Sequence, residues 1–573
     1  MNATHQTVGP TGSPIFQRCR LTVALTAAVT PALTAALALS GGAAFAQQVP
    51  DAGQLLQQER QAPSLPRPSP SIQIAPSATA NTLPGGASVS LKAVRFTGHT
   101  RFSSAQLGSV VSAIDGQTFD LAGLQALAQK ISEHYRSAGY PFARAFIPEQ
   151  KFTDGVLEIA IVEGRYGEVS VTGDNRFGTA AQSFLRSLVP GEVIESHSLE
   201  RSTLLLNDQP GIRTAPVIRP GQEVGTGDLL IDVSPTPALR GELGLDNQGN
   251  RYTGEYRTRG SLQWDSPFML GDQISVRGSV SDEGQWLGSL GYTRPLGSSG
   301  LRASVGYAHT RYELAKQFAN LDATGTADIA SLGLSYPLVR STQNNLTLVG
   351  TYQHKKLNDQ QGAAGTRSRK NTMGLPLALQ FDRRDALGGG GITYGSLGYT
   401  AGNLRLDDAV KAVDAASANT QGSFYKWNLD VSRLQATPVA GLTLFGRVST
   451  QSASKNLDSS EDFGLGGSSG VRAYPVGEGF GDEGWLVQLE ARYQLGSVAP
   501  YVFYDAGHTR VNKKNWTPAD NQRELAGYGL GVRYSDPAWS VDAAVAWRSQ
   551  GGRAVSDTAQ RNPRVWVSAT WRF

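Results

Sequence analysis

The sequence predicts two small α+β domains followed by an all-β transmembrane barrel of about 16 antiparallel strands. The last nine residues alternate, with apolar side chains on one face of a strand and mostly polar ones on the other, as a membrane-barrel strand requires. All nine tryptophans lie at or after Trp264, and tryptophan favours membrane–water interfaces. From Leu239 onward, alternating segments are separated by Gly, Asn, Asp and Ser, which are turn residues. The outward face of the last strand is expected to carry Val565, Val567, Ala569, Trp571 and Phe573.

The composition is compatible with such a barrel. A mean hydropathy of −0.26 is that of a soluble protein, but half of every barrel strand faces a wet lumen, so membrane barrels have low hydropathy too. The 66 glycines suit tight turns and close strand packing. The net charge of +4 is too small to predict nucleic acid as a partner.

Residues 1–46 are predicted to be a secretory signal peptide. Arg18 and Arg20 precede an apolar run from Leu21 to Leu39, and Ala44-Phe45-Ala46 offers a small-x-small cleavage site. The only cysteine, Cys19, lies in this segment, so we expect the mature protein to have no thiol and no disulfide.

Residues 47–62 are predicted to contain a short helix, with Asp51 as its N-cap. Residues 63–87 contain several prolines and are predicted to be an extended, flexible linker. A short helix joined to the rest of the chain by such a linker can bind elsewhere in the protein and dissociate again. The alternative is a disordered mature N-terminus.

Two similar α/β units are predicted next, over residues 88–164 and 165–238, each of a size typical of a minimal domain. Both have the order β-α-α-β-β, which fits a small sheet covered by two helices on one face. In the first unit we expect strands over Val89–Phe96, Ala143–Ile147 and Val156–Val162 and helices over Ser103–Ile114 and Leu121–Tyr135. In the second we expect strands over Glu168–Thr172, Pro216–Arg219 and Asp228–Val233 and helices over Thr179–Leu188 and Leu199–Asn207.

Residues 239–573 are predicted to be the barrel. Strand after strand carries charges on one face, which therefore needs water, and apolar residues with aromatic ends on the other. A soluble sandwich would have to bury that apolar face against a second layer. At about 21 residues per strand and connection, this region accommodates about 16 strands.

No catalytic or cofactor motif is present in the sequence. The seven histidines are scattered without metal-ligand spacing, and there is no phosphate-binding loop motif. We therefore expect no enzyme activity, no metal and no cofactor.

One constellation stands out late in the barrel. Arg472 lies near the middle of a long glycine-rich loop that leads into a strand carrying Glu490, and the next strand carries Asp505. An arginine folded inward could bridge these carboxylates with charge-assisted hydrogen bonds. On spacing alone, a solvated arginine on an outer loop is the favoured alternative.

Three segments resemble the TpsB transporters of two-partner secretion, the hemolysin activation/secretion family. Val471-Arg472-Ala473-Tyr474 is similar to the family's valine–arginine–glycine–aromatic motif at the tip of an inward-folded sixth loop, with Ala473 in place of the usual glycine. Phe503-Tyr504-Asp505-Ala506-Gly507 is similar to its F-x-D-x-G strand, and residues 381–385 resemble a further recurring segment. The resemblance implies a plug helix, two polypeptide-transport-associated (POTRA) domains and a 16-stranded barrel. It also implies that Arg472 pairs with Asp505 and Glu490.

The function that the resemblance implies is secretion of a partner protein across the outer membrane. The POTRA domains would capture an unfolded TpsA-type partner, hemolysin- or adhesin-like, in the periplasm, without nucleotide hydrolysis. Outer-membrane lipid and the barrel-assembly machinery are further expected partners, the latter reading a terminal signal that includes Trp571 and Phe573. The alternatives are an outer-membrane assembly factor of related fold and a gated porin.

Overall fold

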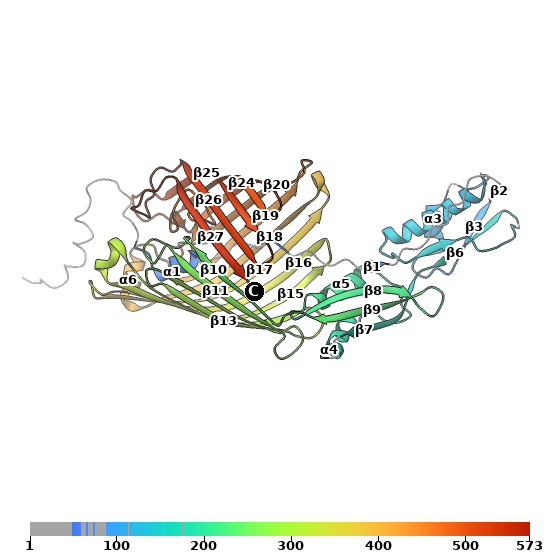
Figure 1. Ribbon diagram of the computed structural model, residues 1–573, viewed down its shortest axis with the longest axis horizontal. Helices are drawn as coiled ribbons and strands as arrows, with labels where there is room; N and C mark the ends of the chain where they lie inside the picture. The colour runs from blue at the N-terminus through green and yellow to red at the C-terminus, as the bar shows by residue number, and fades with distance from the viewer. Residues whose placement is uncertain are drawn as a thin grey trace, which may run out of the picture. The chain divides into compact units, whose positions relative to one another are not determined.

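The computed structural model in Figure 1 describes residues 49–58, 65–66, 73–74, 88–112, 114–152, 154–173 and 176–573. The expected signal peptide and most of the expected linker lie outside the described residues. Helix α1 (Ala52–Gln58) falls within the segment expected to be helical. Asp51 caps it, its Oδ1 accepting from the backbone N–H of Gln54 at 2.9 Å. Seven residues are too few for a stable isolated helix, so tertiary contacts must hold α1 in place.

The first unit is a three-stranded sheet packed against two helices (Figure 1). Its strand order is β3–β6–β5, with β3 parallel and β5 antiparallel to β6. The expected strand Val89–Phe96 is divided, because Leu91 pairs its N–H with Gln117 while Lys92 turns to Gly155. The elements are β2 (Val89–Ser90), β3 (Ala93–Thr97), α2 (Ser104–Val110), β4 (Thr118–Phe119), α3 (Leu121–Ser137), β5 (Arg144–Phe146) and β6 (Val156–Val162).

A buried carboxylate at the end of β6 holds this unit together. Glu163 accepts from the backbone N–H of Thr100 at 2.6 Å and of Arg101 at 2.8 Å, and from the Tyr135 hydroxyl at 3.0 Å. Burial alone would raise the pKa of Glu163, but the hydrogen bonds, those from Thr100 foremost, outweigh it and lower the pKa below its ordinary 4.5. The ionised form is therefore the one that the fold selects.

This arrangement predicts an acid-dependent stability. A lowered carboxyl pKa stabilises the fold above the ordinary value, and the contribution is lost as pH falls through the folded value. We expect Glu163→Gln to cost roughly 1–3 kcal/mol at neutral pH, with a gap to the wild type that narrows below about pH 4. Thermal unfolding of both proteins, followed by the helical circular-dichroism signal at several pH values, measures this difference in stability. A gap that stays constant into acid would contradict the role of the charge.

The second unit contains a four-stranded sheet of order β1–β8–β9–β7. The expected helix Thr179–Leu188 ends early, because the Ser183 hydroxyl bonds back to the Ala180 carbonyl at 2.6 Å and the chain tightens into a 3₁₀ turn. The elements are β7 (Arg165–Gly173), α4 (Gly178–Gln182), a 3₁₀ turn (Ser183–Leu185), α5 (Ser196–Asn207), β8 (Ile212–Pro220) and β9 (Thr226–Pro235).

Strand β1 (Gln73–Ile74) comes from the expected linker. It pairs parallel to β8 at Val217 and Ile218 and so covers part of that edge. Pro216 lacks a backbone N–H. It is tolerated in β8 because, apart from the short β1, β8 is the edge strand of this sheet. A strand of two residues has no detectable periodicity, so it could not be predicted from the sequence.

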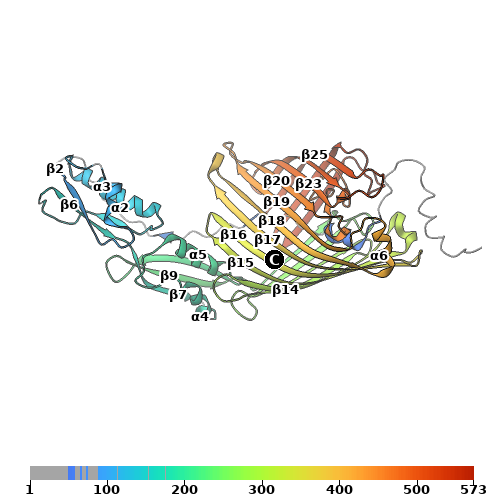
Figure 2. The ribbon, with the colours of Figure 1, turned by 180° about the vertical axis from the view of Figure 1, so that it is seen from behind.

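The rest of the chain forms a closed barrel of 16 antiparallel strands, as predicted (Figures 1 and 2). We call the end at which β10 begins the proximal end and the opposite end the distal end. The last strand, β27, closes the barrel on the first, β10, through five residue pairs from Glu242–Arg572 to Asp246–Ser568. The strands are β10 (Leu239–Asp246), β11 (Arg257–Asp265), β12 (Gln273–Ser281), β13 (Trp286–Pro295), β14 (Arg302–Glu313), β15 (Ala323–Arg340), β16 (Asn344–Gln361), β17 (Thr366–Asp385), β18 (Gly391–Leu406), β19 (Gly422–Ala436), β20 (Leu442–Ala453), β23 (Glu483–Tyr493), β24 (Val498–Arg510), β25 (Gln522–Ser535), β26 (Trp539–Gln550) and β27 (Arg564–Arg572).

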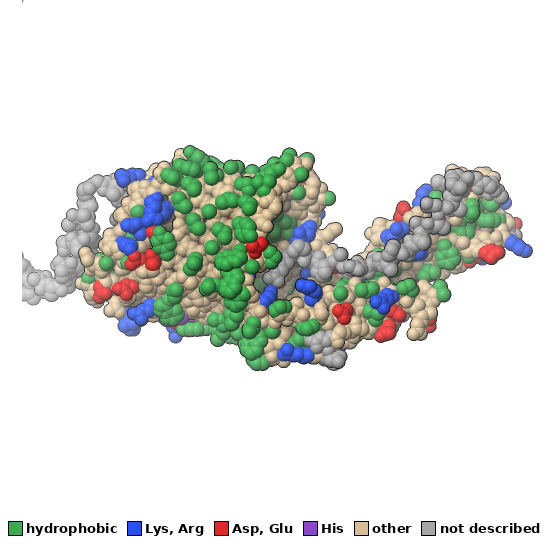
Figure 3. All heavy atoms as spheres, in the orientation of Figure 1, with side chains coloured by type: hydrophobic (Ala, Val, Ile, Leu, Met, Phe, Trp, Pro, Cys, Tyr) green, Lys and Arg blue, Asp and Glu red, His purple; other side chains and the backbone are tan. Residues whose placement is uncertain are grey.

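The outer wall of the barrel is apolar (green in Figure 3). Exposed leucine, valine and aromatic side chains alternate along the strands with lumen-facing residues, as the sequence pattern predicts. Trp516 lies in the loop after β24 and Trp566 is buried inside the barrel. The other tryptophans occupy outward strand positions: Trp264, Trp286, Trp427, Trp485, Trp539, Trp547 and Trp571. In the described part of the chain, no helix is both long and apolar enough to cross a membrane.

Candidate functional site

A long distal loop folds into the lumen and carries the arginine that the sequence singled out. This clamp loop, residues 454–482, includes a 3₁₀ turn (Ser459–Glu461) and a small hairpin of β21 (Phe463–Gly464) and β22 (Phe480–Gly481). Its apolar side chains pack on an inner wall that is locally apolar rather than polar, mostly on β23 to β26. The cluster consists of Phe463, Leu465, Val471, Ala473, Tyr474, Leu486, Tyr501, Phe503, Leu525, Ala544, Ala546 and Ala554.

Arg472 makes a bidentate ion pair with Asp505. Its Nε lies 2.8 Å from Oδ2 and its Nη2 lies 2.7 Å from Oδ1, and the backbone N–H of Arg472 adds a third bond to Oδ2 at 3.1 Å. Nη1 reaches Oε1 of Glu490 at 2.6 Å. The guanidinium also stacks over the Phe503 ring, 3.6 Å from its centroid. The structure thus brings together the arginine and the two carboxylates of the expected constellation.

The cluster is buried and balanced in charge. Arg472 is 5 % exposed and Asp505 is 0 % exposed, and Arg492 bonds the second oxygen of Glu490 at 2.7 Å. Two guanidinium groups therefore hydrogen-bond these two carboxylates, and a third, that of Arg533, lies 3.9 Å from Glu490 and pairs with Asp542 at 2.6 Å. Removing one partner of such a buried pair typically costs about 3–5 kcal/mol, because it leaves an uncompensated charge in place. The arrangement can hold the loop firmly without making a covalent bond.

The remaining expected site residues surround this cluster. Val471 donates its N–H to the Leu465 carbonyl at 2.7 Å and forms the turn. The Tyr474 hydroxyl donates to the carbonyls of Gln550 at 2.7 Å and Gly552 at 3.0 Å. Gly507 makes room for the loop, because a Cβ there would lie 2.6 Å from Leu465.

Two other expected segments lie far from the cluster along the barrel strands. Residues 381–385 form the proximal end of β17, where Asp385 accepts two hydrogen bonds of 2.9 Å from Arg433 of β19. Trp571 and Phe573 lie at the proximal end of β27 and contact each other, with ring centroids 4.9 Å apart.

Ala473 fits the loop despite replacing the usual glycine. It is not among the described non-glycine residues with positive φ, so the expected need for left-handed backbone at this position does not arise. Its methyl group is buried against Gly527 of β25, where a Cβ would lie only 2.4 Å away. The alanine thus occupies space that the facing glycine leaves open.

This fit predicts a compensating pair. Gly527→Ala is expected to displace the loop tip and to lower the barrel's stability by about 1–3 kcal/mol, since the two methyl groups would overlap. Combining it with Ala473→Gly should restore part of that loss, since the added methyl group would still lie 2.9 Å from the Trp547 carbonyl oxygen. Thermal unfolding of the two single variants and the double variant measures the coupling, and strictly additive effects would contradict the contact.

Sequence reasoning missed two supports of the clamp loop. Trp566 of β27 donates its Nε1–H to the Arg472 carbonyl at 2.7 Å. Glu478 is fully buried and accepts from Arg523 at 2.6 Å and from the Ser556 hydroxyl at 2.6 Å. The alternation of the last strand places Trp566 on the lumen face. A tryptophan inside a wet lumen needs a packing partner, so this position could have indicated that a loop lies against it.

Helix α1 lies inside the distal half of the barrel. Ala52 and Leu55 are buried against Tyr312, Leu357 and other residues of the β14–β16 wall and its loops. The backbone N–H of Ala52 donates to Asp359 at 2.9 Å. This packing supplies the tertiary support that so short a helix needs.

A polar cluster ties α1 both to the wall and to the clamp loop. We call Asp51, Lys370, Asp458 and Ser459 the latch. Lys370 of β17 lies 3.2 Å from Asp51 and 2.8 Å from Asp458, and the Ser459 hydroxyl donates to Asp51 at 2.6 Å. Burial alone would raise the pKa of Asp51, but the charge of Lys370 and the bond from Ser459 lower it below its ordinary 3.8.

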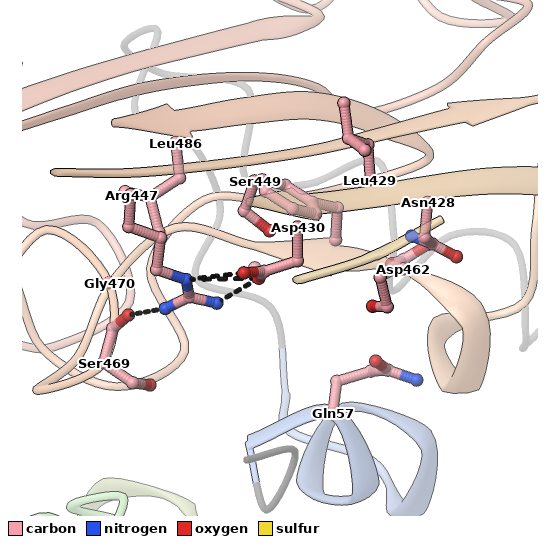
Figure 4. Close-up of a pocket in the computed structure, with 13 residues that line it drawn as sticks. Gln57, Asn428, Leu429, Asp430, Arg447, Ser449, Asp462, Ser469, Gly470 and Leu486 are labelled. Carbon is pink, nitrogen blue, oxygen red and sulfur yellow. Dashed lines mark hydrogen bonds and ion pairs between the residues drawn. The ribbon is translucent and has the colours of Figure 1, made fainter. Parts of the chain in front are cut away.

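A small cavity of about 180 Å³ separates α1 from the opposite wall (Figure 4). Gln57 of α1 points towards it, and Asp430 and Arg447 line it from β19 and β20. Those two side chains bind each other, with Arg447 Nη2 and Asp430 Oδ2 2.5 Å apart. The attachments of α1 are thus concentrated on the β14–β17 side and on the clamp loop. Among the described residues, no group of three or more His, Cys, Asp or Glu side chains could hold a metal ion.

Comparison with known proteins identifies the family. The model of the haemolysin secretion/activation protein ShlB/FhaC/HecB matches residues 225–534, and the model of the ShlB-type POTRA domain matches residues 89–164. The heme/hemopexin transporter protein HuxB of Haemophilus influenzae (strain 86-028NP) is 27 % identical over 454 residues, covering 77 % of this chain and 80 % of HuxB. The outer membrane transporter CdiB of Dickeya dadantii (strain 3937) is 25 % identical over 511 residues, covering 86 % and 88 %.

The solved structure of CdiB from Escherichia coli has a similar fold. It superposes with a TM-score of 0.71 at 20 % identity, covering 91 % of this chain and 96 % of that chain. The first family model spans more than half of the chain, and the POTRA model precedes it in the order that the fold shows. The chain therefore belongs to the haemolysin secretion/activation protein family ShlB/FhaC/HecB, and it is a non-enzymatic outer-membrane transporter of two-partner secretion with its POTRA region in the periplasm.

Proposed function

We propose that this transporter captures its partner in an extended form in a groove of the first POTRA domain, between α3 and β5. The groove has a volume of about 1090 Å³ and is lined by exposed apolar side chains that include Leu121, Phe146 and Phe152. This groove is the observation that carries the proposal, because it combines a strand edge with pockets for apolar side chains. An unfolded secretory protein offers both an unpaired backbone and exposed apolar residues.

The sheet edges of the second unit favour this choice. In the second unit, β1 covers part of β8, and the Gln182 side chain bonds to the backbone of β7 on its outer edge at 3.0 and 2.9 Å. On β5, the Ser132 hydroxyl accepts from the Ala145 N–H at 2.9 Å. A partner strand must therefore displace Ser132 or rely on the apolar pockets for most of its affinity.

The later steps of the proposal use the lumen. The partner enters when α1 leaves the latch and the clamp loop shifts while Arg472 holds its tip. No nucleotide-binding motif is present in the sequence, so folding of the partner outside the cell would make export irreversible. The barrel-assembly machinery is proposed to read the proximal aromatic pair Trp571 and Phe573, and outer-membrane lipid to contact the apolar wall.

The capture site is tested by photo-crosslinking and secretion. A photoreactive residue at Phe146 is expected to crosslink to the partner in the periplasm, and one at Val224, fully exposed on the second unit, is not. Phe146→Ala with Phe152→Ala should lower secretion roughly tenfold at unchanged transporter level. Equal crosslinking at both positions, or undiminished secretion, would exclude the groove as the capture site.

A further inference from the structure

We propose that a band of cations on the outer wall, at the distal ends of β14 to β18, binds the phosphate groups of outer-leaflet glycolipids. These strands are seen in Figure 2. The band consists of Arg311, Lys356, Arg367, Arg369 and Arg405, all of which are exposed. It lies outside the lumen and takes no part in the secretion path proposed above.

Strand register places these cations side by side. Lys356 is opposite Asn371, and Asn371 is opposite Arg405, so Lys356 and Arg405 lie two strands apart in one row. Arg369 is opposite Asn358 in the next row. Neighbouring strands are about 4.8 Å apart, so Lys356 and Arg405 are separated by about 10 Å along the sheet.

Strand alternation shows that the band faces outward. Lys355 pairs with Glu461 of the clamp loop and Leu357 packs beneath α1, so both point into the lumen and Lys356 points away from it. Lys370 belongs to the latch, which places Arg369 outside by the same alternation.

The band lies at the distal edge of the aromatic belt, where Arg311 is opposite the exposed Trp286. Exposed aromatic side chains at Tyr307, Tyr352, Tyr425 and Trp427 lie nearer the proximal end of the same or adjoining strands. Such belts mark the level of the lipid headgroups. Residues a few positions farther along each strand therefore lie at headgroup height on the outer-leaflet side.

Among the described residues, no carboxylate forms an ion pair with any member of the band. Asp328 lies directly opposite Lys356 in the strand register, but its Oδ1 is hydrogen-bonded to Tyr307 at 2.5 Å and to His309 at 2.7 Å. Two distal cations elsewhere do form ion pairs: Lys513 with Glu483 at 2.5 Å and Arg561 with Glu255 at 2.9 Å. A concentrated excess of positive charge at headgroup height fits an anionic headgroup, and Arg and Lys both bind phosphate well.

A glycolipid fits better than a singly charged phospholipid. Cations two strands apart can each engage one phosphate of a diphosphorylated disaccharide, whereas a single phosphate engages only one of them. Binding here would anchor the β14–β18 wall, which lies across the barrel from the β10–β27 closure.

The test compares two triple variants of the full-length protein in detergent. Lys356→Gln, Arg369→Gln and Arg405→Gln remove three of the five cations of the band. Arg510→Gln, Lys513→Gln and Arg561→Gln remove the same amount of charge from distal cations that have counterions. Equilibrium binding is measured with diphosphoryl lipid A, phosphatidylglycerol and phosphatidylcholine, after circular dichroism shows that both variants are folded.

The wild type is expected to bind lipid A more tightly than either phospholipid. At about fivefold for each cation, the band variant should lose roughly a hundredfold in lipid A affinity at low salt. The control variant should lose little. An equal loss in both variants, or phosphatidylglycerol binding as tight as that of lipid A, would overturn the proposal.

Discussion

Arg472→Ala is expected to free the clamp loop and to reduce partner secretion at least tenfold while the barrel still inserts. The substitution leaves Asp505 buried without its guanidinium, while Glu490 keeps Arg492, a change of about 3–5 kcal/mol against the docked loop. It also removes the side chain that stacks on Phe503. Secreted partner in the medium, transporter in the outer membrane and protease cleavage within residues 454–482 report the three effects separately.

The matched control is Arg492→Ala. Arg492 touches Glu490 but not Asp505, and its side chain is 22 % exposed, so we expect a much smaller effect. Asp505→Ala should behave like Arg472→Ala, and the double variant should be little worse than either single one, because both remove the same interaction. Normal secretion by both single variants at normal membrane levels would show that the ion pair has no part in export.

Lys370→Gln is expected to raise the ion conductance of the resting pore in planar bilayers. Lys370 is the cation that faces both Asp51 of the helix and Asp458 of the clamp loop. Its loss leaves two carboxylates close together without a cation. If this weakens the binding of the helix by about 3 kcal/mol, the fraction of pores without the helix rises by roughly a hundredfold. Lys411→Gln, which changes an exposed lysine of α6 (Asp408–Ala415), is the control for the change in charge. Equal conductance in the two variants would rule out the latch.

Moderate acid is not expected to open the latch. Asp51 has a lowered pKa, so its ionised form persists through neutral and mildly acidic solution. The attachment weakens only as pH falls below the ordinary value of 3.8 towards the lower docked value. The conductance of the pore, measured from neutral pH to below pH 3.8, tests this expectation. An increase in conductance confined to the neutral range would contradict it.

The barrel was predictable because its signal repeats. A period of two along strands such as β23 places Gln488 and Glu490 in the lumen and Leu489 on the lipid side, and the structure has them there. Sixteen such strands make the pattern robust to local exceptions. The resemblance, rather than the spacing, supplied the expectation that Arg472 turns inward.

The latch and the linker strand could not be predicted in the same way. Asp51, Lys370 and Asp458 come from three distant parts of the chain, and only the closed barrel brings them together. The apolar inner wall beneath the clamp loop breaks the polar-inside rule, because Tyr501 and Phe503 face a loop rather than water. These exceptions to the strand pattern lie where the lumen is filled.

The short closure between β10 and β27 has a consequence for how the barrel forms. Every other neighbouring pair in the barrel follows the order of the chain, whereas Glu242 must find Arg572 after all the intervening strands have been made. Contacts between residues so distant in sequence have the highest loop-closure entropy and form slowly. The closure is therefore expected to be the last step of assembly, and until it forms the nascent barrel presents two unpaired strand edges.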